Sequence, residues 1–309
     1  MNLHTIIGVT DFSVLGDAAL DRAAMLAKTH RATLEIMSLA SAEGPSGTAA
    51  LARLTAAAEQ LAERHVLPVR PIAQVANGLA DLAEEADSAD LIVLPATRER
   101  ASRTWIHGYM AERLLRLSWC PVLVVKQVPR RDYEQILVAV DFKPQSRTLV
   151  ELAARIDGKA DVTLFHALAT QIETRLRSSD VAPDIIRDWR ESCMRDARQR
   201  LHSFADGSGA QHERIRHALG RGEPGHQVAS HQKRNGADLT VVGKHRGSMF
   251  TDLLFGAVAH QVLREATSDV LIVPHDYLPA ARRVLSPRQA APHRTKTSFA
   301  LASARRNVA

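Results

Sequence analysis

The stretch ADLTVVGKHRGSMFTDLLFGAVAHQVLREATSDVLIV, residues 237–273, decides the fold because residues 89–125 repeat its pattern without a gap. The two stretches lie 148 residues apart, and 12 of their 37 aligned positions are identical. Each begins with a short apolar run, passes through a loop and an amphipathic segment, and ends in a second apolar run, which predicts strand, loop, helix and strand. A repeat on this scale indicates a duplicated domain rather than a solenoid unit.

The openings of the two copies also match, now 130 residues apart. Residues 6–12 (IIGVTDF) and 136–142 (ILVAVDF) are apolar runs that end in Asp-Phe, and apolar residues at helical spacing follow each of them. The two separations differ by 18 residues, so the second copy contains additional residues. We expect them within residues 170–206, a polar, arginine-rich stretch with helical character.

Short apolar runs alternate with helical segments in both copies. Near-continuous apolar runs are typical of parallel strands that are covered on both faces. The sequence therefore predicts an α/β protein with two tandem doubly wound, Rossmann-like domains, each a mainly parallel five-stranded sheet flanked by helices. We place these domains at residues 1–128 and 132–276, separated by a short linker, and expect ligands at the carboxyl ends of the strands.

The net charge of +6 is not spread evenly along the chain. Residues 280–309 contain seven basic and no acidic residues, which leaves 33 basic against 34 acidic residues in residues 1–279, a net of −1. Residues 277–309 have the composition of a disordered, basic tail, and contact with nucleic acid or an anionic membrane surface is the alternative. No apolar run approaches the ~18 residues of a membrane span, and two cysteines make no disulfide framework, so we expect a cytoplasmic protein.

Two features together resemble the universal stress protein family in its tandem, two-domain form, over residues 3–276. The first is the strand that ends in Asp-Phe before a helix. The second is an Ala-Asp-Leu strand, a glycine loop, and a helix that leads to a final strand of the Cys-Pro-Val-Leu-Val-Val type, residues 120–125. The resemblance implies a stress-response protein that binds ATP or another adenine nucleotide. It also implies that the final strands, residues 122–125 and 270–273, pair with each other and cover two sheet edges.

The glycine loop of the second copy departs from the family pattern. Nucleotide-binding members have Gly, two residues, Gly, nine residues and then Gly-Ser or Gly-Thr. The second copy keeps Gly243 and Gly256 at the family separation. Arg246 stands at the middle glycine position with Gly247 after it, and Ala257 replaces the hydroxyl residue.

The first copy departs further. Pro95 replaces the first glycine, Arg98 and Glu99 replace the middle one, and Gly108 is followed by the bulky Tyr109. We therefore expect the phosphate pocket to be lost in the first copy and nucleotide binding to be confined to the second.

Glycines suit a phosphate loop because backbone N–H groups at a turn and at a helix N-terminus must approach the phosphate closely. Lys244 and Arg246 add cationic donors that offset the missing hydroxyl. The resemblance further implies that Asp141 accepts a hydrogen bond from the adenine or ribose and that the backbone near residues 166–167 lines the base. The expected nucleotide-binding residues are Asp141, Ala167, Gly243, Lys244, His245, Arg246, Gly247, Gly256 and Ala257, with Mg²⁺ accompanying the nucleotide.

Other candidate sites have weaker patterns. His226 with His231, and His212 with His217, stand five residues apart, which does not place two imidazoles on one helix face. We therefore expect no metal site. Asp11 in the first copy is expected to cap the helix that follows it.

No residue pattern indicates a catalytic nucleophile or general base, so we expect at most slow nucleotide hydrolysis. The leading hypothesis is a sensor or signalling protein that binds nucleotide through its second copy. Gly243, Gly256, Lys244 and Asp141 favour it. The alternative, favoured by Ala257 and the displaced glycine, is an interaction or scaffold protein that binds no nucleotide and acts as an intramolecular pseudo-dimer. A protein partner and a homodimer of whole chains are further hypotheses.

Overall fold

The apolar runs form ten strands of a single sheet in this computed structural model, which describes residues 3–39, 47–73, 79–96, 110–206, 214–244, 257–274 and 277. The strands are β1 (Thr5–Thr10), β2 (Thr33–Ser38), β3 (Val69–Pro71), β4 (Leu91–Pro95), β5 (Val122–Val125), β6 (Gln135–Ala139), β7 (Asp161–Leu168), β8 (Ile215–Arg221), β9 (Leu239–Lys244) and β10 (Asp269–Pro274). The described helices are α1 (Val14–His30), α2 (Gly47–His65), α3 (Leu79–Ala86), α4 (Met110–Leu117), α5 (Ser146–Ile156), α6 (Gln171–Ser178), α7 (Pro183–Asp206), α8 (Pro224–Asn235) and α9 (Ala257–Glu265).

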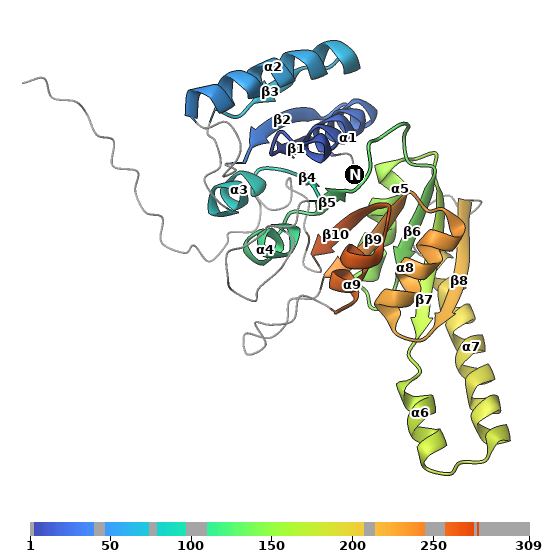
Figure 1. Cartoon of the computed structure of the whole chain (residues 1–309). Coiled ribbons are helices and arrows are strands. Elements are labelled where there is room, and N and C mark those ends of the chain that lie inside the picture. The colour runs from blue at the N-terminus through green and yellow to red at the C-terminus, as the bar shows by residue number, and fades with distance from the viewer. Residues whose placement is uncertain are drawn as a thin grey trace, which may run out of the picture. The chain divides into compact units, whose positions relative to one another are not determined.

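The strand order shows the duplication directly. Across the sheet it is β3-β2-β1-β4-β5-β10-β9-β6-β7-β8, so each half has the same order when it is read from its outer edge to the middle (Figure 1). All described strand pairs within a half are parallel. In each half the chain builds outward on one side of its first strand and then crosses to the other side. The predicted pair of doubly wound, five-stranded parallel sheets is confirmed.

The two halves meet through an antiparallel pairing of β5 with β10. Leu123 pairs with Leu271, flanked by the pairs Val124–Val270 and Val122–Ile272. Because Leu123 and Leu271 are equivalent positions of the repeat, a pseudo-twofold axis passes between them. The predicted pairing of the two final strands is confirmed, and residues Met1–Tyr277 form one compact unit. Apart from Tyr277, the basic tail lies outside the described residues.

Two lysines tie the halves together beside this junction. Lys244 Nζ donates a hydrogen bond to the Leu115 carbonyl (2.7 Å) at the C-terminus of α4. Lys126 Nζ donates to the Leu263 and Ala266 carbonyls (2.6 Å each) at the C-terminus of α9. Leu115 and Leu263 are equivalent positions, so each half places a cation at the negative end of a helix in the other half.

A buried polar cluster also spans the junction. Arg22 on α1 forms an ion pair with Asp269 on β10 (Nε to Oδ2, 3.4 Å) and lies over the Tyr133 ring at 4.0 Å. The same carboxylate accepts hydrogen bonds from the Tyr133 hydroxyl (2.7 Å) and from the Lys126 backbone N–H (2.9 Å). Arg22 also donates to the Arg131 carbonyl in the linker (2.9 Å), so the cluster fixes the linker against both halves.

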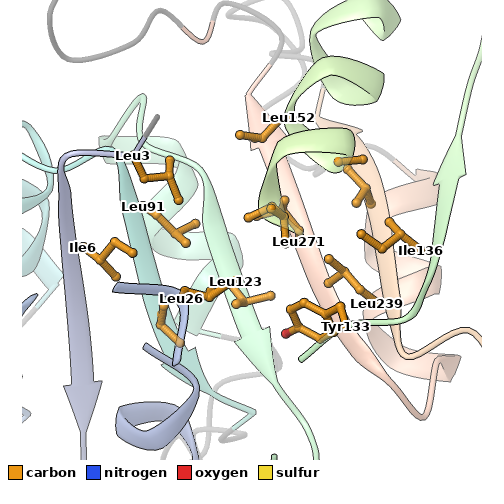
Figure 2. Packing of buried hydrophobic residues seen from close by; sticks show 14 of the residues in the cluster. Leu3, Ile6, Leu26, Leu91, Leu123, Tyr133, Ile136, Leu152, Leu239 and Leu271 are labelled. Atoms are coloured by element: carbon orange, nitrogen blue, oxygen red, sulfur yellow. The ribbon is translucent and has the colours of Figure 1, made fainter. Parts of the chain in front are cut away.

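Both faces of the sheet are buried, which explains the near-continuous apolar runs of the strands. Neighbouring residues such as Ile6 and Ile7 point to opposite faces and belong to different apolar clusters. Helices α1, α2, α5 and α7 cover one face, and α3, α4, α8 and α9 cover the other. Figure 2 shows that the first cluster is continuous across the junction, from Leu3 and Leu26 in the first half to Leu152 and Leu239 in the second.

The additional residues of the second half form two helices joined by a turn, rather than one helical stretch. Helix α6 has no counterpart in the described first half, where α2 alone stands between β2 and β3, as α7 stands before β8. Figure 1 shows α6 and the adjoining part of α7 extending beyond the sheet. The extra residues lie within residues 170–206, as expected. The turn at residues 179–182 was not predicted from the sequence.

Candidate functional site

A cavity of about 230 Å³ lies at the carboxyl ends of β6, β7 and β9. The central strand β6 is the point from which the chain winds outward to β7 and then crosses to β9. This is the switch point of the second half, where doubly wound sheets hold their ligands. The cavity is lined by Ala139, Val140, Asp141, Ser146, Leu149, Phe165, His166, Ala167, Pro224, Val228, Val242, Gly243 and Val258. Three of the predicted site residues, Asp141, Ala167 and Gly243, are thus brought together.

The carboxylate of Asp141 is held in place by the first turn of α5. Its Oδ1 accepts hydrogen bonds from the hydroxyl of the buried Ser146 (2.6 Å) and from the Lys143 backbone N–H (3.1 Å). Lys143 also pairs with Oδ2 at 3.2 Å, where both side chains are substantially exposed. One oxygen is therefore fixed by Ser146, and the other is paired with an exposed lysine, a weak interaction that a ligand can displace.

The imidazole of His166 forms a second polar wall of the cavity. Its Nδ1 lies 2.8 Å from the Val140 carbonyl, which can only accept, so the proton is assigned to Nδ1. Burial lowers the pKa of His166, although the Val140 carbonyl and Asp141 oppose this shift. The ring is thus neutral near pH 7, and Nε2 is left as a hydrogen-bond acceptor.

The remaining predicted site residues divide into three groups. Ala257 begins α9, and the next residue, Val258, lines the cavity. Lys244 is directed elsewhere: its ammonium is buried against Leu115 of the first half, so the expectation that it faces the phosphates is corrected. The alternative partner wins because a buried ammonium needs hydrogen-bond acceptors, and the C-terminal carbonyls of α4 supply one. His245, Arg246, Gly247 and Gly256 lie outside the described residues.

The start of α8 completes the far wall. Glu223 caps this helix by accepting hydrogen bonds from the Gly225 and His226 backbone N–H groups (3.1 and 2.7 Å). Pro224 follows at the first helical position, where its missing N–H costs nothing. The cap fixes Pro224 and Val228 against the cavity.

The equivalent carboxylate of the first half is held differently. Asp11 Oδ1 accepts hydrogen bonds from the Ser13 hydroxyl (2.6 Å) and backbone N–H (3.0 Å). Gly16 stands where the second half has Ser146, and a Cβ there would lie 2.5 Å from Asp11 Oδ1. The cap of α1 is Ser13, which accepts a hydrogen bond from the Gly16 N–H, and not Asp11 as expected. Ser13 wins because it is the residue directly before the helix.

Sequence reasoning missed Ser146 and the His166 side chain. The serine has a detectable signal, since it follows Asp141 by five residues at the start of a helix, where a hydroxyl can reach back to the strand end. The histidine has none, because its role depends on the pairing of β6 with β7.

The histidines of the two pairs contact other side chains in the described residues. His226 Nδ1 lies 2.9 Å from Glu265, and the His231 ring lies 4.7 Å from Phe165. His217 contacts the His202 ring instead, and His212 is outside the described residues. Where the structure describes the chain, no three potential ligands gather into a metal site. A membrane-crossing helix is also absent there, because none is both long and apolar enough.

Comparison with known proteins gives consistent results. The model of the universal stress protein family matches residues 2–126 and again residues 132–274. A curated relative, universal stress protein YxiE from Bacillus subtilis, is 23% identical over 146 residues, which are 46% of this chain and 99% of the relative.

Two solved structures share the whole tandem arrangement. A functionally unknown protein from Pseudomonas aeruginosa has a TM-score of 0.64 at 21% identity, covering 90% of this chain and 94% of its own. A universal stress protein from Archaeoglobus fulgidus has a TM-score of 0.59 at 17% identity, covering 88% and 98%. These likenesses establish the fold.

Proposed function

Because the chain belongs to the universal stress protein family, we propose that this stress-response protein binds ATP or another adenine nucleotide in its second half. The observation that carries the proposal is the cavity at the switch point, where Asp141, Ala167 and Gly243 meet from three strands. Its walls are mostly apolar with a few convergent polar groups, which is the usual composition of a small-molecule site.

The adenine and ribose fit the described walls. Val140, Phe165 and Val228 offer apolar surface to the base. The Asp141 carboxylate can accept from an amino or ribose hydroxyl group, and the unprotonated Nε2 of His166 offers a second acceptor. Both acceptors are held by hydrogen bonds to the protein, so little ordering cost falls on binding.

The phosphates belong at the N-terminus of α9. Backbone N–H groups of the first helical turn are unpaired donors, and the helix dipole favours an anion there. Gly243 leads out of β9 toward this turn and Ala257 begins it. We assign His245, Arg246, Gly247 and Gly256 to the intervening loop as phosphate contacts, with Mg²⁺ on the phosphates. The function is sensing or signalling, with hydrolysis at most slow.

A second function is favoured by the Lys244 contact. This lysine serves the junction between the halves, which suits an interaction or scaffold protein that works as an intramolecular pseudo-dimer without nucleotide. The two functions differ in one measurable property, the affinity for ATP.

Calorimetric titration with ATP and Mg²⁺ tests the proposal on the full chain. We expect the parent protein to bind one equivalent. Asp141→Asn should weaken binding by about tenfold or more, because a carboxylate acceptor is lost. Asp11→Asn at the equivalent position of the first half is the matched control and should bind as the parent does.

A second pair of variants tests the loop. Gly243→Val should abolish binding by filling the strand exit, whereas Pro95→Val in the first half should not change it. Absence of heat with the parent protein would leave the interaction module as the function. Equal binding by Gly243→Val and the parent would place the site elsewhere.

A further inference from the structure

A second cavity, of about 540 Å³, lies between the start of α5 and the C-terminal half of α7. We call it the α5–α7 groove. Its lining includes two phenylalanines and two arginines, together with one acidic side chain, Asp196. The volume falls within the range of roughly 300–1,000 Å³ that is usual for small-molecule sites.

The two arginines and the two rings form a chain of contacts. Arg147 lies over Phe204 at 5.9 Å and Arg200 lies over Phe142 at 6.0 Å, measured to the ring centroids. The two rings meet edge to face at 6.4 Å. The groove therefore has an aromatic centre in which each ring has a guanidinium near it.

The backbone at Phe142 is held in an unfavourable conformation to build this centre. Its φ is 61°, in the left-handed region that non-glycine residues rarely adopt. The ring packs against His166 at 4.2 Å, so Phe142 separates the groove from the candidate nucleotide cavity. Phe12 at the equivalent position has φ 60°, so the strained residue is a repeated feature of the fold.

In the equivalent groove of the first half, the arginines interact with neighbouring side chains. This groove is smaller, about 250 Å³, and Asp17 stands where the second half has Arg147. Arg64 is paired with Asp21 at 2.7 Å, and Arg53 lies over Phe12 at 4.6 Å.

The arginines of the second half, Arg147 and Arg200, also lie over rings, but among the described residues neither has a carboxylate partner like that of Arg64. Both line the cavity, and their contacts in the described part of the chain are with the two rings and with no carboxylate. The replacement of Asp17 by Arg147 thus turns a self-neutralised groove into one with two available cations.

We propose that the α5–α7 groove is a binding site for a small organic anion, whose charged group lies between Arg147 and Arg200 and whose apolar part rests on Phe142. A carboxylate, sulfonate or phosphate monoester provides the acceptor oxygens that guanidinium groups prefer. Asp196 lies in the same groove, four residues before Arg200, and repels ligands that carry many negative charges. This selects a compact anion over a polyphosphate, a nucleic acid or an acidic peptide. The proposal does not rest on nucleotide binding by the second half.

Fluorescence titration of the full chain with naphthalene sulfonate, an aromatic monoanion, tests the proposal at physiological salt. We expect one site on the parent protein, and about tenfold or greater loss of affinity in Arg147→Gln/Arg200→Gln, because two charge-assisted hydrogen bonds are removed. Both side chains are exposed, so the variant should remain folded. Arg53→Gln/Arg64→Gln in the first-half groove is the matched control and should bind as the parent does.

The imidazole of His166 gives a local readout. Burial is the main cause that lowers its pKa, and the charge of Arg200 lowers it further. An anion that neutralises Arg200 should therefore raise the pKa of His166, which proton NMR of the imidazole resonance measures with and without the probe. Asp141→Asn should bind naphthalene sulfonate normally even where it loses ATP.

Three outcomes would overturn the proposal. The first is equal affinity of the parent and both double variants, which would assign the probe to the basic tail or another surface. The second is no measurable binding by the parent. The third is an unchanged pKa of His166 at saturating probe.

Discussion

At the scale of single residues, the two halves differ at the fifth residue after the aspartate of the Asp-Phe strand end. Ser146 is buried and fixes the Asp141 carboxylate, whereas Gly16 leaves no hydroxyl at the equivalent place. The two side-chain heavy atoms that serine has and glycine lacks decide whether the carboxylate is held from the helix or from the preceding turn. The difference between the copies therefore extends beyond their glycine loops.

Ser146→Ala tests this assignment. The substitution removes the shortest hydrogen bond of the partly exposed Asp141 carboxylate, so we expect the free energy of unfolding to fall by about 1 kcal/mol and ATP affinity to fall with it. Urea denaturation and calorimetry measure the two effects. Ser13→Ala removes the α1 cap and should cost about 1 kcal/mol while leaving ATP affinity unchanged. Unaltered ATP binding by Ser146→Ala would show that the carboxylate needs no support from α5.

At the scale of elements, a single carboxylate attaches the inserted helix to the domain. Glu173 on α6 is buried and accepts hydrogen bonds from Arg177 (2.8 Å), from Arg190 on α7 and from Arg221 at the end of β8. The hydrogen bonds from Arg190 and Arg221 outweigh burial and lower the pKa of Glu173. Because the folded pKa is depressed, the contribution to stability is present above the ordinary carboxyl pKa and is lost as the pH falls through the folded value.

Glu173→Gln should release α6 without unfolding the sheet, since the helix lies outside the core clusters. We expect faster amide exchange across residues 171–182 at neutral pH and little change in the strands. In the parent, acid should loosen α6 in the same way, whereas the variant should lack this pH dependence. Glu191→Gln, which removes an exposed ion pair with Arg195 on α7, is the control. Equal exchange in the two variants would contradict the role given to Glu173.

At the scale of the whole molecule, the halves depend on the buried pair of Arg22 and Asp269. Burial raises the pKa of Asp269, although its hydrogen bonds and Arg22 oppose the shift. Removing the guanidinium would leave a carboxylate buried without a countercharge, which is among the most costly changes that a protein interior can suffer.

Arg22→Met should lower the free energy of unfolding by about 3–5 kcal/mol at neutral pH. Without Arg22 the folded pKa of Asp269 rises further above its unfolded value, so the folded state takes up a proton as the pH falls. The deficit relative to the parent should therefore shrink between about pH 7 and about pH 5. Urea denaturation at both values checks this. Arg131→Met, which breaks an exposed pair with Glu134, should cost less than about 1 kcal/mol. A pH-independent deficit would refute the explanation.

Much of the fold could be predicted because the repeat is local and gapless. Strands β5 and β10 follow from residues 89–125 and 237–273, and their pairing was implied by the family resemblance. The turn between α6 and α7 was missed although Pro183 marks it, since proline favours the first position of a new helix and disfavours helix in the residue before it.

The candidate site was predictable only where its residues follow strands. Asp141, Ala167 and Gly243 stand at strand ends, and the parallel order of β6, β7 and β9 brings strand ends together. Lys244 was misassigned because its partner, Leu115, is 129 residues away and becomes its neighbour only when the two halves pack. Contacts across the junction have no signal in the spacing of residues within one copy.

The antiparallel seam between β5 and β10 has a consequence for synthesis on the ribosome. Once β5 has been made, the 143 residues from Lys126 to Ser268 must be added before its partner β10 begins. At ~5–20 residues per second this takes roughly 7–30 s, during which the nascent first half carries an apolar strand with one unpaired edge. A β10 from a neighbouring chain can fill that edge, which would exchange halves between two molecules. Efficient production of the monomeric fold therefore depends on keeping nascent chains apart for that interval.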